Sequence, residues 1–168
     1  MKKALIASIP LLLIVGVFAL PVIADNTLVR FEGGIGVIPV SSGVGTAATA
    51  VVVNRNIVRG VQPAGQIWMI ADLSADVKLD GRISVDGRGL LLAGGNNIGT
   101  KGTVQSVRAR LFCGGVAHDS GLVPLKPNGD FRINDVLTPV PLDPCATPVL
   151  LIVGSGGNWF AAGIPKSN

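Results

Sequence analysis

The chain has 168 residues, of which 48% are hydrophobic and only 14% are charged, with 23 glycines and 11 prolines. This length fits one ordinary domain, and the composition favours many turns between apolar stretches over long amphipathic helices. The formal net charge is +4, but the basic residues are scattered among aspartates. A nucleic-acid-binding protein would gather them into a patch or stripe, so no nucleic-acid partner is expected.

Residues 1–24 contain the three parts of a cleaved secretory signal peptide in the required order. Lysines open the chain, residues 4–20 carry no charge, and small side chains up to Ala24 form the site that a signal peptidase reads. The alternative is an uncleaved anchor, because the apolar run approaches the ~20 residues that cross a bilayer. The sequence favours cleavage, which leaves residues 25–168 as a single β domain, secreted or periplasmic and without a membrane span.

Cys113 and Cys145 are the only two cysteines of the chain. Disulfides persist in the compartments that receive exported proteins, and two cysteines allow only one internal pairing. The alternative is a pair of buried free thiols. A metal site is disfavoured because a single His and two distant cysteines lack the spacing of metal ligands. The sequence therefore predicts a Cys113–Cys145 disulfide, with neither a metal nor a cofactor.

Residues 67–87 show the strongest periodicity. Every odd-numbered residue in this stretch is apolar or Gly, and from residue 72 onward every even-numbered residue is polar. This is the period of a half-buried strand, so the odd-numbered side chains are expected to face the core. The run exceeds an ordinary strand, which predicts a turn at residues 80–81 or 86–87. A two-residue Asp-Gly hairpin would break the alternation, whereas a three-residue loop ending in Gly, or a bulge, preserves it.

Further strands are expected where short apolar stretches lie between Gly, Pro, Asn and Ser clusters. These stretches are residues 34–40, 50–61, 104–113, 122–125, 131–136, 149–153 and 159–164. Residues 126–130 are expected to form a hairpin turn, and residues 93–102 are the longest turn-like segment. Many short strands without crossover helices predict an all-β fold, either an antiparallel β-sandwich or a Greek-key barrel.

His118 is the only histidine, so any mechanism that combines Ser or Cys with His must use it. Asp119 and Ser120 follow it directly, but adjacent placement is not a signature of a catalytic triad. Residues 154–157 are the nearest approach to a nucleophile elbow and lack its G-x-S-x-G spacing. The preferred interpretation is a polar loop residue near the disulfide, with a small secreted hydrolase using His118 as the alternative.

Four aspartates, Asp72, Asp76, Asp80 and Asp86, fall on one face of the alternating stretch. Residues four apart along a strand are about 13 Å apart, which is too far to share one cation or to act as a catalytic pair. A solvated strand face explains them, and no catalytic residues are predicted here.

The two tryptophans and one Gly-Asn loop are the remaining candidates for ligand binding. Trp68 and Trp159 can stack on a planar ligand, although core packing is the preferred interpretation for both, since residues 67–70 are apolar on both faces. The loop around Asn96 and Asn97 is the best binding-loop candidate, because loops on a β scaffold often carry recognition. Its composition fits a plain turn equally well.

Several short stretches carry a resemblance to a group of exported bacterial proteins without an assigned activity. The stretches are Val58-Arg59-Gly60, Trp68-Met69-Ile70-Ala71, Asp80-Gly81-Arg82-Ile83, Gly89-Leu90-Leu91-Leu92-Ala93-Gly94-Gly95-Asn96, Ala109-Arg110-Leu111-Phe112-Cys113-Gly114, Gly129-Asp130-Phe131-Arg132-Ile133 and Pro148-Val149-Leu150-Leu151-Ile152. This resemblance covers most of residues 25–168 and implies export, but no substrate or site. More remotely, the later half resembles secreted β domains related to chordin. It lacks their His-rich strand, so no residue is carried over.

These observations together predict a secreted, non-enzymatic β-sandwich that binds an unidentified ligand or envelope component, or serves as a structural module of the cell envelope or the extracellular space. The hydrolase that uses His118 is the alternative. A subunit of a larger surface assembly is a third possibility, which would expose an apolar sheet edge.

Overall fold

The computed structural model describes residues 26–38 and 56–166. The predicted signal peptide lies outside the described residues, as does the first half of the predicted strand 50–61. The described parts of the chain consist of strands, turns and loops and contain no helix, which confirms the predicted all-β class. It follows that no helix in these parts is long and apolar enough to cross a membrane.

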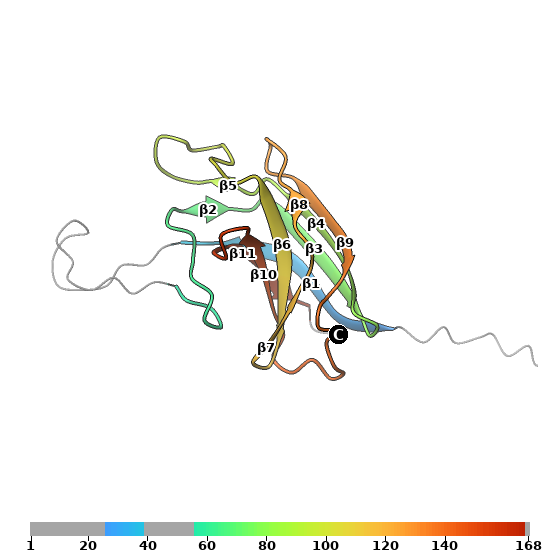
Figure 1. Ribbon diagram of the computed structural model, residues 1–168. Coiled ribbons are helices and arrows are strands. Elements are labelled where there is room, and N and C mark those ends of the chain that lie inside the picture. The colour runs from blue at the N-terminus through green and yellow to red at the C-terminus, as the bar shows by residue number, and fades with distance from the viewer. Residues whose placement is uncertain (1–25, 39–55, 167–168) are drawn as a thin grey trace, which may run out of the picture.

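Nine strands form one curled antiparallel sheet (Figure 1). Its spatial order is β7 (Val116–Asp119), β6 (Ser106–Cys113), β10 (Val149–Gly154), β11 (Trp159–Pro165), β1 (Thr27–Gly36), β3 (Asp72–Lys78), β4 (Arg82–Arg88) and β9 (Phe131–Val136). The short strand β8 (Val123–Pro124) also pairs with β6. Two further strands, β2 (Trp68–Met69) and β5 (Leu91–Leu92), form a separate two-stranded sheet at one end.

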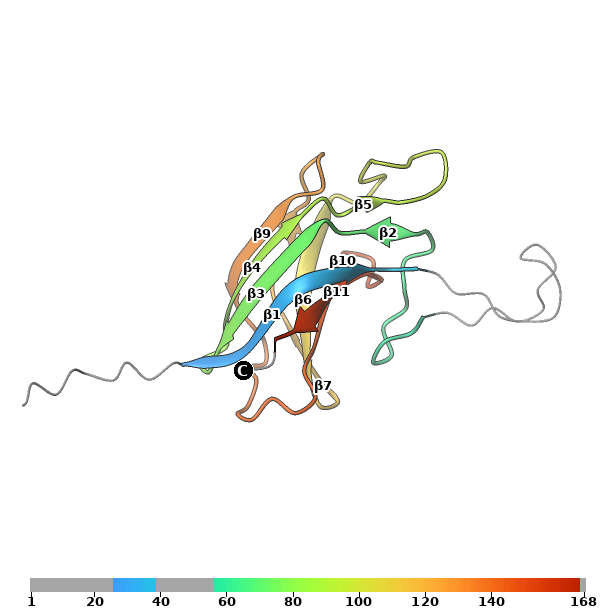
Figure 2. The same ribbon diagram turned by 180° about the vertical axis from the view of Figure 1, so that it is seen from behind.

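The large sheet curls until its two edges meet. Asp119 at the end of β7 and Thr138 just after β9 exchange two backbone hydrogen bonds of 2.9 Å. Seen from behind, β1, β3, β4 and β9 lie side by side across one wall, with β6 and β10 beyond them (Figure 2). This barrel-like arrangement encloses the hydrophobic core and agrees with the predicted sandwich or barrel.

The β3–β4 hairpin confirms the predicted three-residue loop. Val77 pairs with Ile83, which leaves residues 79–81 as the loop between the strands. Gly81 has a φ of 83°, and its N–H donates to the Lys78 carbonyl at 3.0 Å. Along both strands the odd-numbered side chains are buried, as the alternation requires; Val77 and Val85, for example, are fully covered. The even-numbered side chains form the polar outer face.

The alternation does not continue into residues 67–71, and this part of the prediction is wrong. Ile67 and Met69 are 42% and 52% exposed, whereas Trp68 and Ile70 are buried. The phase reverses because the chain leaves the large sheet at Ala71, and β2 pairs with β5 instead. The expectation that both faces of residues 67–70 are buried is therefore also wrong.

Most of the other predicted strands are present, with shifted ends. Residues 104–113, 122–125, 131–136, 149–153 and 159–164 correspond to β6, β8, β9, β10 and β11. The predicted strand 34–40 is the end of β1, which begins earlier, at Thr27, and contains a bulge near Gly33. Its last two residues lie outside the described range. Strand β7, which carries His118, was not predicted.

The turn over residues 126–130 is present, but it does not join a hairpin. The Lys126 N–H donates to the Asp130 carbonyl at 3.0 Å, which closes the turn. The flanking strands then separate, because β8 pairs with β6 and β9 pairs with β4. Residues 93–102 form the expected long turn segment.

Residues 56–66, called the strap here, lie beside the start of β11, where Pro63 forms an isolated parallel bridge with Trp159. Their only strand-like pairings are isolated bridges, so the described end of the predicted strand 50–61 is irregular. Trp159 holds the strap in place: its indole Nε1–H donates to the Asn56 carbonyl at 3.0 Å, and its backbone N–H donates to Gln62 at 2.9 Å. Trp159 is 2% exposed, which confirms its predicted core packing.

The Cys113–Cys145 disulfide fastens the long β9–β10 connection to the end of β6. The two Cα atoms are 4.7 Å apart, and the cysteines are separated by 32 positions in the sequence. Next to it, the Gly114 N–H donates to the Ala146 carbonyl at 2.6 Å. The disulfide therefore fixes the end of the barrel opposite β2 and β5.

Candidate functional site

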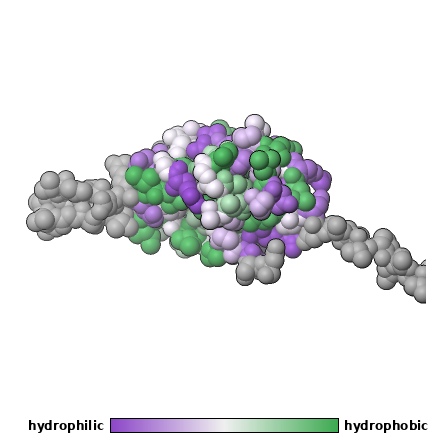
Figure 3. Space-filling model, turned by 90° about the horizontal axis from the view of Figure 1, so that it is seen from below, coloured by the Kyte–Doolittle hydropathy of each residue, from purple (hydrophilic) through white to green (hydrophobic). Residues whose placement is uncertain are grey.

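The two ends of the barrel differ in character. At the end that carries β7 and the β9–β10 connection, Figure 3 shows apolar and polar side chains interspersed. At the end that carries β2 and β5, a cavity of about 390 Å³ opens; we call it the mouth pocket. Ligand pockets typically measure about 300–1,000 Å³ and often lie in barrel mouths, so this pocket suits a small ligand.

The mouth pocket is assembled from four separate parts of the chain. They are the end of the strap, the two-stranded sheet, the loop between β5 and β6, and the turn between β10 and β11. The lining residues are Ala64, Gly65, Gln66, Trp68, Leu92, Asn97, Gly102, Thr103, Val104, Asn158 and Phe160.

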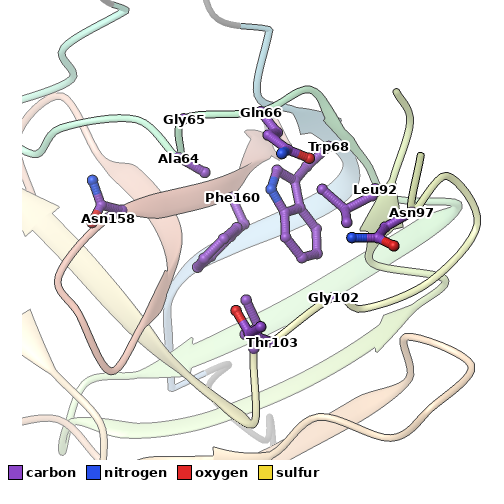
Figure 4. A pocket seen from close by; sticks show the side chains of 11 residues that line it. Ala64, Gly65, Gln66, Trp68, Leu92, Asn97, Gly102, Thr103, Asn158 and Phe160 are labelled. Atoms are coloured by element: carbon purple, nitrogen blue, oxygen red, sulfur yellow. The ribbon is translucent and has the colours of Figure 1, made fainter. Parts of the chain in front are cut away.

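Two aromatic rings form the apolar base of the pocket. Trp68 and Phe160 contact each other edge to face, with ring centroids 4.6 Å apart and planes at 71° (Figure 4). Their arrangement depends on a close approach of β1 to β2, where the Trp68 N–H donates to the Val37 carbonyl at 2.9 Å. A side chain on Gly36 would place a Cβ 2.7 Å from the Met69 Cα and even closer to the Trp68 carbonyl. Only Gly allows this approach.

Polar side chains surround this base. Gln66, Asn97 and Asn158 each offer a carboxamide, which can both donate and accept hydrogen bonds, and Thr103 offers a hydroxyl (Figure 4). Asn158 uses its Nδ2–H₂ on the Pro63 carbonyl at 3.0 Å, and this bond sets its position. No charged side chain lines the pocket.

The loop that carries Asn97 is fixed by backbone hydrogen bonds to β5. The Leu92 N–H donates to the Thr100 carbonyl at 2.8 Å, and the Gly99 N–H donates to Leu92 at 2.9 Å. The Thr100 hydroxyl then donates to the Asn97 carbonyl at 2.8 Å. These bonds hold the loop across the mouth, so that Asn97 lines the pocket.

The mouth pocket offers carboxamides, a hydroxyl and aromatic rings to a ligand. Its lining contains no carboxylate, imidazole, ammonium or thiol, and no base lies among the lining residues to activate the Thr103 hydroxyl. Carboxamides and a hydroxyl around aromatic rings can orient a ligand that carries both apolar surface and hydrogen-bonding groups.

His118 does not meet Asp119 or Ser120 in the manner of a catalytic triad. His118 is 4% exposed, and its Nδ1–H donates to the Pro139 carbonyl at 2.6 Å. The Asp119 carboxylate is turned to Arg110, from which it accepts two hydrogen bonds of 2.6 Å. The Ser120 hydroxyl accepts from the Ala109 N–H and donates to Gly121. Each side chain thus serves a local structural contact.

Asp72, Asp76 and Asp86 lie on the outer face of the strands, as predicted, whereas Asp80 lies in the exposed β3–β4 loop. Asp76 pairs with Arg30 and Lys78, and Asp86 pairs with Arg88 and Arg132. Hydrogen bonds from Arg132 hold the pKa of Asp86 below its ordinary value. Within residues 26–38 and 56–166, no three His, Cys, Asp or Glu side chains gather as metal ligands would.

The structure brings together two of the residues that the sequence singled out. Trp68 and Asn97 both line the mouth pocket, whereas Asn96 is exposed outside it and Trp159 lies under the strap. Sequence reasoning missed Gln66, Asn158, Thr103 and Phe160. No periodicity or motif marks Gln66, Thr103 and Asn158, because they lie in turns or irregular segments, whereas Phe160 lies in β11 within the predicted strand 159–164.

Comparison of the chain with protein-family models, with curated proteins and with solved structures found no match.

Proposed function

We propose that this chain is an exported, non-enzymatic binding protein of the cell envelope or its surroundings, and that its mouth pocket holds a small uncharged ligand. A neutral saccharide is the ligand class that fits. The observation that carries the proposal is the lining itself: two aromatic rings, three carboxamides, one hydroxyl and no charge around one cavity.

The lining disfavours the other common ligand classes. A charged ligand would lose its hydration without meeting an opposite charge, which is costly in a partly enclosed site. A hydrocarbon would cover the three carboxamides and leave their remaining donors and acceptors without partners, at a cost of about 1–3 kcal/mol for each group that is buried in this way. A sugar has C–H surface for the aromatic rings and hydroxyls that both donate and accept, so it answers both requirements.

Export is the second part of the proposal. Residues 1–24 have the layout of a signal peptide, and the Cys113–Cys145 disulfide suits an oxidising compartment. The resemblance to exported bacterial proteins points the same way. Intact-mass measurement of the protein from its producing cells tests this part: a chain that begins at Asp25 is expected, and a full-length chain with free thiols would contradict it.

The ligand is tested by NMR, because the chain carries its own internal control. It has two tryptophans, and the indole N–H signal of Trp68 reports on the mouth pocket, whereas that of Trp159 reports on the strap. Titration with a panel of neutral mono- and disaccharides is expected to shift the Trp68 signal saturably. A panel that leaves this signal unchanged would refute the saccharide as ligand.

Two neighbouring asparagines provide a matched pair of variants. Asn97 lines the pocket, whereas Asn96 is exposed next to it and does not. Loss of one ligand hydrogen bond costs about 1 kcal/mol, so Asn97→Ala is expected to weaken binding about fivefold, and Asn96→Ala is expected to leave it unchanged. Equal effects of the two substitutions would place the ligand elsewhere.

A further inference from the structure

A second hollow lies on the outside of the barrel, next to the mouth pocket. This hollow, called the outer groove here, has a volume of about 460 Å³. It lies between the strap, the outer face of β6 and β7, and the β10–β11 turn, and its lining residues are Arg59, Gly60, Val61, Gln62, Arg110, Phe112, Ala117, Gly156, Gly157 and Asn158. Asn158 lines both cavities, so the two adjoin.

The charges of the outer groove are of one sign. Arg59 and Arg110 line it, and no carboxylate does. Behind Arg110, the Asp119 carboxylate is shared, because Arg108 Nη1 also lies 3.9 Å from it. The Nε atom of Arg108 is buried without a hydrogen-bond partner. One carboxylate thus serves two guanidinium groups, and the groove keeps an excess of positive charge.

Arg110 is held in a fixed orientation, and part of its guanidinium group remains available to a ligand. Its Nε and Nη2 atoms donate to the two Asp119 oxygens at 2.6 Å each, and this hydrogen bonding raises the pKa of Arg110. A guanidinium group has five N–H donors. Among the described residues, no partner is seen for its Nη1 atom, so this end of a pre-oriented guanidinium can serve a ligand.

Arg59 occupies a backbone position that disfavours it. The Val58 and Val61 backbones exchange hydrogen bonds of 3.1 and 2.9 Å across a two-residue turn, and the central residues Arg59 and Gly60 have φ values of 50° and 80°. A turn with positive φ at both central residues favours Asn, Asp or Gly at the first. Arg at this place strains the backbone by about 1 kcal/mol or more, and such strain clusters at functional sites.

The contact of Arg59 with Thr147 leaves most of its donors available. Arg59 Nη2 donates to the Thr147 hydroxyl at 3.0 Å and to its carbonyl at 3.3 Å. Thr147 is itself the other non-glycine residue with positive φ, at 44°, within the described ranges. Arg59 and Thr147, the two strained residues, are thus joined by hydrogen bonds, which fix the Arg59 guanidinium at the rim of the groove.

We propose that the outer groove binds an anionic oxygen group, namely a carboxylate, sulfate or phosphate, between Arg59 and Arg110. Guanidinium groups form short, charge-assisted and often bidentate hydrogen bonds with such groups. The site stands independently of the proposed saccharide in the mouth pocket. Because the cavities adjoin at Asn158, one acidic saccharide can also occupy both.

The test is an NMR titration with inorganic sulfate, inorganic phosphate and D-glucuronate, at constant ionic strength in a buffer free of other oxyanions. At least one probe is expected to shift the backbone amide signals of Gly156, Gly157 and Ala117 saturably. Tighter binding of glucuronate would identify an acidic saccharide as the source of the anion, and tighter binding of phosphate or sulfate would identify an ester. No saturable shift with any probe would overturn the proposal.

The decisive variant is Arg59→Asn, because Asn is favoured at this turn position and the strap is expected to keep its fold. Loss of charge-assisted hydrogen bonds is expected to weaken anion binding about tenfold or more. Arg82→Asn is the charge-matched control: Arg82 is exposed on the outer face of β4 and pairs with Asp80, and its loss is expected to change affinity less than about twofold. Equal weakening in both variants would reduce the effect to net charge and overturn the site.

The two proposals fail in different ways. Neutral sugars report through the Trp68 indole signal, whereas anions report through the amides of the outer groove. D-Glucose in place of D-glucuronate separates the sugar ring from the charge. A mouth pocket that binds no sugar would therefore leave the anion result standing, and the reverse is equally true.

Discussion

The β3–β4 hairpin and the mouth pocket are built in different ways. In the hairpin, residues 72–88 pair with their near neighbours in the chain, and every second side chain enters the core. The mouth pocket collects side chains from four segments spread over residues 64–160, and most of them lie in turns or irregular stretches. A regular local pattern thus stabilises the scaffold, whereas irregular long-range contacts shape the site.

The largest effect is expected when the hairpin loses a core side chain. Leu73 on β3 is fully buried, so Leu73→Ala removes apolar contacts and leaves a cavity, at a cost of about 2–5 kcal/mol in the free energy of unfolding. Urea denaturation measures it. Ser74→Ala on the exposed face of the same strand is the control and is expected to change the free energy by less than about 0.5 kcal/mol. Similar costs for both would contradict a one-sided strand.

A smaller but more specific effect is expected at the mouth. Gly36→Ala would force the β1 and β2 backbones apart, because the added Cβ meets the Trp68 carbonyl and the Met69 Cα. Overpacking of this kind costs about 1–3 kcal/mol. Because Trp68 moves with β2, the substitution is expected to weaken saccharide binding as well.

Gly115→Ala is the control for this substitution, since a Cβ at Gly115 meets no atom within 4 Å, its φ is not positive, and Gly115 does not line the mouth pocket. Calorimetric unfolding and the Trp68 indole shift measure both effects. If Gly36→Ala left stability and the Trp68 signal unchanged, the close approach of β1 to β2 would not be what positions the aromatic base.

The same comparison explains what the sequence could predict. The alternation predicted which side chains of residues 72–88 face the core, and it limited the turn to residues 80–81 or 86–87, because strand faces and turns are set by neighbouring residues. The reversal at Ala71 was missed because it depends on β2 pairing with β5, and residues 67–71 continue the same apolar spacing. Local pattern cannot reveal which distant partner a strand will choose.

The site was predictable only in part, for the same reason. Trp68 and the Asn97 loop stood out by residue type, but their contact with Phe160 and Asn158 depends on the curl of the whole sheet. Arg59 is unusual for its position, because a charged residue occupies a turn position where Asn is favoured. This feature can be recognised only from the backbone angles, which residue type alone does not give.

The smallest effect is expected on the outer face of the hairpin, where charge rather than burial is involved. Hydrogen bonds from Arg132, and then from Arg88, lower the pKa of Asp86 below its ordinary value near 3.8. The Asp86 carboxyl group therefore holds its proton less tightly in the folded state than in the unfolded state. The stabilisation is fully present above the unfolded pKa and is lost as pH falls through the lower pKa of the folded state.

Asp86→Asn is thus expected to cost less than about 1 kcal/mol at pH 7, because exposed ion pairs are screened by solvent. The difference from the natural chain should shrink as the pH falls below about 4, and 0.5 M NaCl should reduce it at neutral pH. Asp72→Asn is the control, since Asp72 lies on the same face and has no ion pair among the described residues. A difference that grew towards low pH would reverse the sign of the linkage. It would show that the Arg132–Asp86 pair does not stabilise this face.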